Sequence, residues 1–68
     1  MEATKESKIA LVQRELEVIA NSIYLHTIKA RAARRVDNKQ MEKISMVEIE
    51  MLEKLTDVYE EELAEISK

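Results

Sequence analysis

The side chains best suited to chemistry in this 68-residue sequence are a single histidine, His26, and scattered carboxylates. One histidine cannot build a multi-histidine metal centre, and no Glu-x-x-His pair occurs. Cysteine and glycine are both absent, which excludes thiol nucleophiles, zinc knuckles and the glycine-rich loops that hold phosphate groups. Paired carboxylates could act as general acid and base only inside a pocket. The sequence therefore predicts no enzyme, no catalytic residues, no metal and no cofactor.

The apolar residues instead follow two heptad seams, which are typical of packed α-helices. Apolar positions recur at alternating spacings of three and four residues, the a and d positions of a heptad. The second seam does not continue the phase of the first, so one uninterrupted helix does not explain the pattern. The seam residues are Ile9, Val12, Leu16, Ile19, Ile23, His26, Ala30 and Ala33, then Ile49, Leu52, Thr56, Tyr59, Leu63 and Ile66.

The change of phase falls at residues 36–39, where the chain is richest in turn-forming residues. Asn38 tolerates a left-handed backbone, and Asp37 can cap a following helix with Gln40 in the reciprocal capping position. We therefore predict an all-α fold, an antiparallel helical hairpin. It forms a single domain over residues 1–68, with helix 1 at about 5–35, a turn at 36–38 and helix 2 at about 39–66.

A turn centred between Asp37 and Asn38 places residues whose numbers add to 75 opposite each other. This register pairs the small residues Ala30 and Ser45 near the turn, and it sets His26 against Ile49. We interpret His26 as a core histidine bonded to a carbonyl or a neighbouring side chain, with a ligand or pH-switch role as the alternative. The register also predicts ion pairs at the rim, Glu48 with Lys29 and Glu62 with Lys8.

A second set of apolar residues lies outside the seam and on one face of the predicted hairpin. An apolar face of this extent on a small monomer usually marks an interface. The sequence therefore predicts a homodimer, two hairpins forming a four-helix bundle, with a different protein chain as the alternative cover. The opposite flank is expected to be polar. The predicted dimer interface consists of Leu11, Val18, Leu25, Ala32, Met41, Ile44, Met51, Leu55 and Val58.

The charge is unevenly distributed, although the net charge is only −3. Residues 29–43 carry six basic against two acidic residues, or +4, whereas residues 44–68 carry two basic against eight acidic residues, or −6. The basic end could pair with a partner's acidic end or contact phosphate or an acidic protein. On the outer face of helix 1, an aromatic and an aliphatic residue stand beside two arginines, which favours a protein contact over RNA stacking. This predicted partner-binding stripe is Tyr24, Ile28, Arg31 and Arg35.

Residues on both sides of the turn carry a resemblance to a known family. They are Leu25-His26, Ile28-Lys29, Asp37, Lys39-Gln40, Lys43 and Ile49-Glu50, over roughly the central half of the chain. The chain resembles in these residues the small helical-hairpin proteins of spindle-shaped archaeal viruses. It is also similar in architecture to the Rop-type RNA modulators, whose hairpins dimerise into four-helix bundles. The first resemblance implies an intracellular viral protein that bridges macromolecules without enzymatic activity.

The predicted location and function follow from these observations. The polar stretch Met1 to Lys8 does not resemble a signal peptide, and the longest apolar run, Ile9 to Val12, is far shorter than the ~20 residues of a membrane span. We expect a cytoplasmic protein, in the host cytoplasm if it is viral, with no membrane contact. The predicted function is a homodimeric adaptor between proteins, with an unidentified protein partner. The alternatives are a Rop-like RNA or DNA binder using the outer face of helix 1, or a subunit dedicated to one larger partner.

Overall fold

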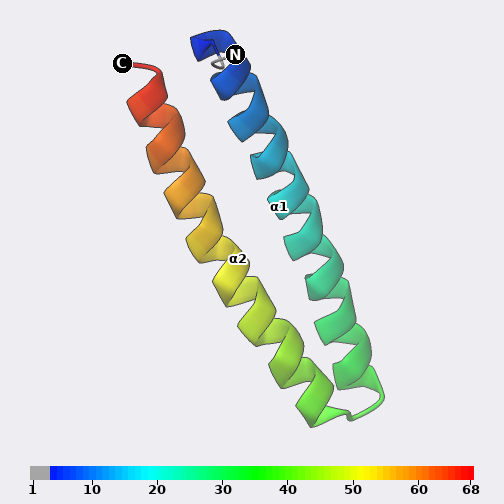
Figure 1. The fold of residues 1–68 in the computed structure, drawn as a ribbon. Helices are drawn as coiled ribbons and strands as arrows, with labels where there is room; N and C mark the ends of the chain where they lie inside the picture. Colours follow the sequence, from blue (N-terminus) through cyan, green and yellow to red (C-terminus); the bar gives the residue numbers. More distant parts are fainter. Residues whose placement is uncertain (1–3) are drawn as a thin grey trace.

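The computed structural model describes residues 4–68 as two long α-helices joined by a short turn (Figure 1). Helix α1 spans Lys5–Arg35 and helix α2 spans Lys39–Ile66. The helices run antiparallel and side by side, so the start of α1 and the end of α2 lie at one end of the hairpin and the turn at the other. The predicted all-helical hairpin is confirmed. Residues 1–3, part of the predicted domain and of its polar N-terminal stretch, lie outside the described residues.

Each helix begins at a residue whose side chain caps its first turn. The Thr4 hydroxyl accepts a hydrogen bond from the Ser7 amide at 3.1 Å, and the Asn38 side-chain oxygen accepts one from the Met41 amide at 3.1 Å. The first amides of a helix have no partner within the helix, so such a cap contributes about 1 kcal/mol. These two caps set the positions at which α1 and α2 start.

The turn exchanges the roles that the sequence suggested for its two residues. Asp37 is the residue with positive φ, at 57°, and Asn38 is the cap of α2. The reason is the end of α1, where the Asn38 amide bonds to Ala33 O at 2.8 Å and the Asp37 amide bonds to Arg34 O at 3.2 Å. This pattern of closing bonds requires a left-handed residue at Asp37. With the cap moved to Asn38, Gln40 no longer stands in the reciprocal position, so the predicted capping box is wrong.

The two helices pack along the predicted seam, and they pack most tightly near the turn. Every seam residue is buried or half-buried. The most buried residues are Ala33, Ala30, Ser45 and Ile19, at 4%, 5%, 2% and 6% exposure. Three of these four are small residues at the turn end, where short side chains let two backbones approach closely. Ala30 and Ser45, which the sequence predicts to lie opposite each other, are both in this cluster.

Two contacts between the helices bracket the register of the hairpin. Near the turn, Arg34 Nε lies 2.6 Å from Glu42 Oε2, and at the open end Lys5 Nζ donates to the Lys68 carbonyl at 3.2 Å. The numbers of these paired residues add to 76 and 73, close to the predicted 75. Lys5 also brings a positive charge to the end of α2, where the helix dipole is negative and the last turn has no basic residue.

The hairpin is elongated and has a thin core. Its extents are 50 × 17 × 14 Å and its radius of gyration is 15.6 Å, whereas a compact domain of this length would have a radius of about 11 Å. No large side chain in the described residues is fully buried. Two helices alone can bury only one stripe of each against the other, so most apolar residues outside the seam stay in water.

Candidate protein interface

An exposed apolar face runs along one side of the hairpin and contains every residue of the predicted dimer interface. All nine of its side chains are exposed, and the large ones range from 39% for Leu55 to 59% for Leu11 and Leu25. On each helix the stripe follows a heptad spacing and is interrupted by charged residues. Neither described helix is therefore long and apolar enough to cross a membrane.

A groove on this apolar face lies between the helices at the turn end. It has a volume of about 410 Å³ and is lined by Lys29, Ala32, Ala33, Val36, Asn38 and Met41. The lining is almost entirely apolar, because the charged tip of Lys29 and the cap Asn38 are its only polar members. The groove joins Ala32 of α1 to Met41 of α2, so stripes from both helices meet on one face. Its floor is low because Ala32 and Ala33 have short side chains.

The opposite flank holds a smaller groove, which corrects the prediction of a polar flank. It has a volume of about 240 Å³ and is lined by Thr27, Ala30, Arg31, Arg34, Met46 and Ile49. Met46 is 50% exposed there. From the sequence, Met46 was expected to fill a gap in the core or an interface, and only polar residues were assigned to this flank. Met46 lies seven residues before Glu53, which belongs to this flank, so the heptad spacing would have placed Met46 there too.

The ion pairs at the rim differ from the predicted ones. The pairs Glu48 with Lys29 and Glu62 with Lys8 are not found among the ion pairs of residues 4–68, and both predictions are wrong. An exposed lysine gains little from such a pair and loses side-chain freedom by forming it. Arg34 instead pairs with Glu42, whose side chain is only 26% exposed and is held beside the seam.

His26 occupies its predicted seam position, but its bonding differs from the prediction. Its Nδ1 atom is buried and has no hydrogen-bond partner among the described residues. By contrast, Thr56, another polar residue in the seam, donates a hydrogen bond from its hydroxyl to the Leu52 carbonyl at 3.0 Å. By the register of the hairpin, His26 lies level with Ile49 of α2. Within residues 4–68, no three His, Asp or Glu side chains gather closely enough to hold a metal ion.

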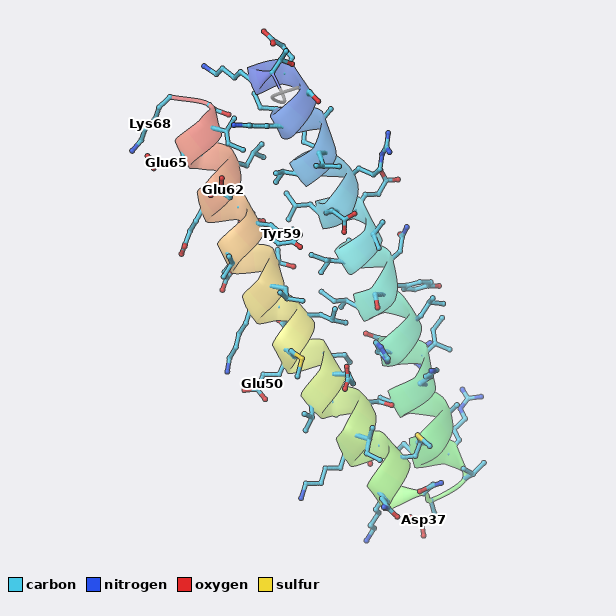
Figure 2. The ribbon with its side chains drawn as sticks, in the orientation of Figure 1. Asp37, Glu50, Tyr59, Glu62, Glu65 and Lys68 are labelled. Atoms are coloured by element: carbon cyan, nitrogen blue, oxygen red, sulfur yellow. The ribbon has the colours of Figure 1, made fainter. Side chains whose placement is uncertain are left out.

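The two tyrosines have different environments, which separates the seam from the outer stripe. Tyr59 is half-buried and points from α2 toward α1, whereas Glu50 on the same helix points away (Figure 2). Tyr24 is 66% exposed on the outer side of α1, and Ile28, one turn further, is 40% exposed. Arg31 and Arg35 are exposed as well. The predicted partner-binding stripe is therefore a continuous surface on one helix.

Two exposed aliphatic residues were missed by the sequence analysis. Val36, at the end of α1, is 74% exposed and lines the groove on the apolar face. Val47 is 50% exposed on α2. Val36 lies in the turn and so was interpreted as a turn residue, although it stands four residues after Ala32 and therefore on the same side of the helix. Its position extends that face to the turn itself.

A comparison of the chain with protein families, curated proteins and solved structures found no match. The resemblance to hairpin proteins of archaeal viruses therefore stays a prediction.

Proposed function

We propose that this chain acts as a homodimeric four-helix bundle, a non-enzymatic adaptor between proteins. The observation that carries the proposal is the apolar face, whose large side chains are 39% to 59% exposed along most of the hairpin. A second copy of the chain has the same face and can cover it by two-fold symmetry, the commonest form of assembly.

The surface area of the chain supports this proposal. The chain exposes 5665 Å², whereas a folded monomer of 7.9 kDa is expected to expose about 4,400 Å². The excess is roughly 1,200 Å², and a stable interface of standard size buries about 800 Å² on each partner. By the same scaling the hairpin buries only about half of the surface of its unfolded chain, where about 60% is usual. The excess is thus larger than the area that one standard interface buries on each partner.

The adaptor role is supported by the outer stripe of α1. Tyrosine and arginine are enriched among the residues that dominate protein interfaces. Tyr24 and Arg31 lie away from the apolar face, and Ile28 and Arg35 lie at its border on the outer side of α1, so a dimer would present the stripe twice. Two equivalent stripes on one particle can hold two partner molecules, or hold one partner at two points with increased avidity.

Sedimentation equilibrium with and without bulk RNA tests both parts of the proposal. We expect a dimer at micromolar concentration whose mass does not change when RNA is added at physiological salt. A monomer under these conditions would overturn the dimer.

Binding to RNA would favour the alternative function, a Rop-like regulator of nucleic acid. Residues 29–43 contain six basic residues, but two acidic residues offset them. Affinity for a phosphate backbone rises with the number of phosphates neutralised and falls steeply with salt. We therefore expect no sub-micromolar binding to RNA hairpins or duplex DNA in a fluorescence-polarisation assay at physiological salt. Salt-sensitive binding in that range would replace the adaptor with the alternative.

A further inference from the structure

The apolar face indicates how two hairpins are arranged, and this inference rests on the proposed homodimer. Two-fold symmetry allows the two faces to meet in two ways. The turns lie either at the same end of the bundle, or at opposite ends with α1 packed on the partner's α1. We infer that the second copy binds with its turn at the opposite end, with the symmetry axis near Ser22.

The groove at the turn end is the first reason. With the axis near Ser22, residues of α1 whose numbers add to about 44 face each other across the interface. The groove around Ala32 then receives the partner's Leu11, which is 59% exposed and one of the most prominent side chains on the face. The branched side chain of Leu11 would fill part of a hollow whose floor is formed by alanines. Val18 and Leu25 face each other in the same way.

The arrangement with both turns at one end would place the groove over the partner's groove. Each groove is about 410 Å³, so two hollows would face each other and leave an unfilled space between the subunits. An interface with such a space loses the contacts that would otherwise line it. The hollow and the prominent side chain lie at opposite ends of α1, so only the opposite-end arrangement brings them together.

The charges on the face are the second reason. Glu15 and Lys29 are both exposed on the flank of the apolar face. In the opposite-end arrangement Glu15 of each subunit lies beside Lys29 of the other subunit, so opposite charges meet. In the same-end arrangement Glu15 would lie beside the acidic Glu60–Glu62 stretch of the partner's α2, although Lys29 would lie near the partner's Glu48. The charges at the ends of the bundle also favour the opposite-end arrangement. In it, residues 29–43, with a charge of +4, lie beside the acidic end of the partner's α2 and not beside residues 29–43 of the partner.

A double-mutant cycle on Leu11 and Ala32 tests the inferred contact. Within one chain these residues are 21 positions apart on one helix, or about 31 Å, so they can interact only through the partner. We expect Ala32→Leu to weaken dimerisation about tenfold, because the new side chain takes the place of the partner's Leu11 in the groove. Leu11→Ala should also weaken dimerisation, because it removes the side chain that enters the partner's groove. The double variant exchanges the large and small side chains and should recover most of the lost affinity. Additive losses would overturn the arrangement. Thr27→Leu, on the opposite flank, is the control and should leave the dimer constant unchanged.

A distance measurement keeps the inference testable even where those variants fold poorly. The chain has no cysteine, so Lys39→Cys provides a unique spin-label site at the turn. In the inferred dimer the two labelled backbones are about 42 Å apart along the bundle axis. In the same-end dimer they are neighbours, and the spin–spin distance falls to about half that value. A dimer with the short distance would overturn the arrangement and leave the homodimer intact, whereas a monomer would overturn the homodimer itself.

Discussion

A charge placed at the centre of the apolar face provides the most direct test of the proposed dimer. Leu25 lies in the middle of the α1 stripe and is 59% exposed in the hairpin, so its exposed part is available to a partner. We expect Leu25→Glu to dissociate the dimer. The hairpin itself should tolerate the change, because position 25 is not part of the seam between α1 and α2.

The size of the effect can be worked out from this exposed fraction. Full burial of a leucine side chain is worth about 1.5–3 kcal/mol, so burial of the exposed 59% contributes about 1–2 kcal/mol per copy. The dimer contains two copies, so about 2–3.5 kcal/mol of association free energy is lost. Two carboxylates without partners in an apolar interface add a further penalty of several kcal/mol. The total is at least ~4 kcal/mol, or about a thousandfold in the dimer dissociation constant.

Sedimentation equilibrium at micromolar concentration, with circular dichroism to follow helix content, measures this effect. Thr27→Glu is the matched control, because it adds the same charge two residues later on the opposite flank. The control should remain a dimer, and so should Arg31→Ala. If Leu25→Glu sediments as a dimer with the affinity of the unmodified chain, the apolar face is not the subunit interface.

Three further predictions concern the turn, the seam and the outer stripe. Asp37→Gly should raise the free energy of unfolding by about 0.5–1 kcal/mol, because glycine adopts positive φ without steric cost; a lower urea midpoint at equal protein concentration would contradict the reasoning. His26→Leu should stabilise the protein by about 1 kcal/mol, since it removes a buried Nδ1 without a hydrogen-bond partner, while His26→Ala should destabilise it by opening a cavity. If urea unfolding shows that His26→Leu costs as much as His26→Ala, Nδ1 is satisfied in solution. Tyr24→Ala combined with Arg31→Ala should leave folding and dimerisation unchanged and reduce recovery of the cellular partner in a pull-down. Equal recovery would exclude the outer stripe, and loss of the dimer would assign the stripe to the subunit interface.

The heptad spacing alone was enough to predict the hairpin and its packing residues. Alternating steps of three and four residues place one stripe of each helix against the other, and the loss of phase near residue 37 separates the two helices. Residues such as Ile19 and Ala30 could be assigned to the core because helical geometry is regular over such lengths. The exposed apolar face could also be read from the sequence, since it follows the same seven-residue period on both helices.

The tertiary structure decided features that depend on atomic distances across the hairpin. The choice between Asp37 and Asn38 as the left-handed residue rests on which amides reach the last carbonyls of α1, and both residue types are compatible with either role. Arg34 pairs with Glu42 in place of the predicted lysine pairs. This choice depends on side-chain reach and burial, which cannot be read from the signs of the charges in the sequence. Whether the buried Nδ1 of His26 meets a hydrogen-bond partner likewise depends on atomic distances, and it has none among the described residues. The groove beside Ala32 exists because the neighbouring Ala32 and Ala33 of α1 have short side chains that do not fill the space between the two helices. Its volume depends on how closely the helices pack, which only the tertiary structure gives.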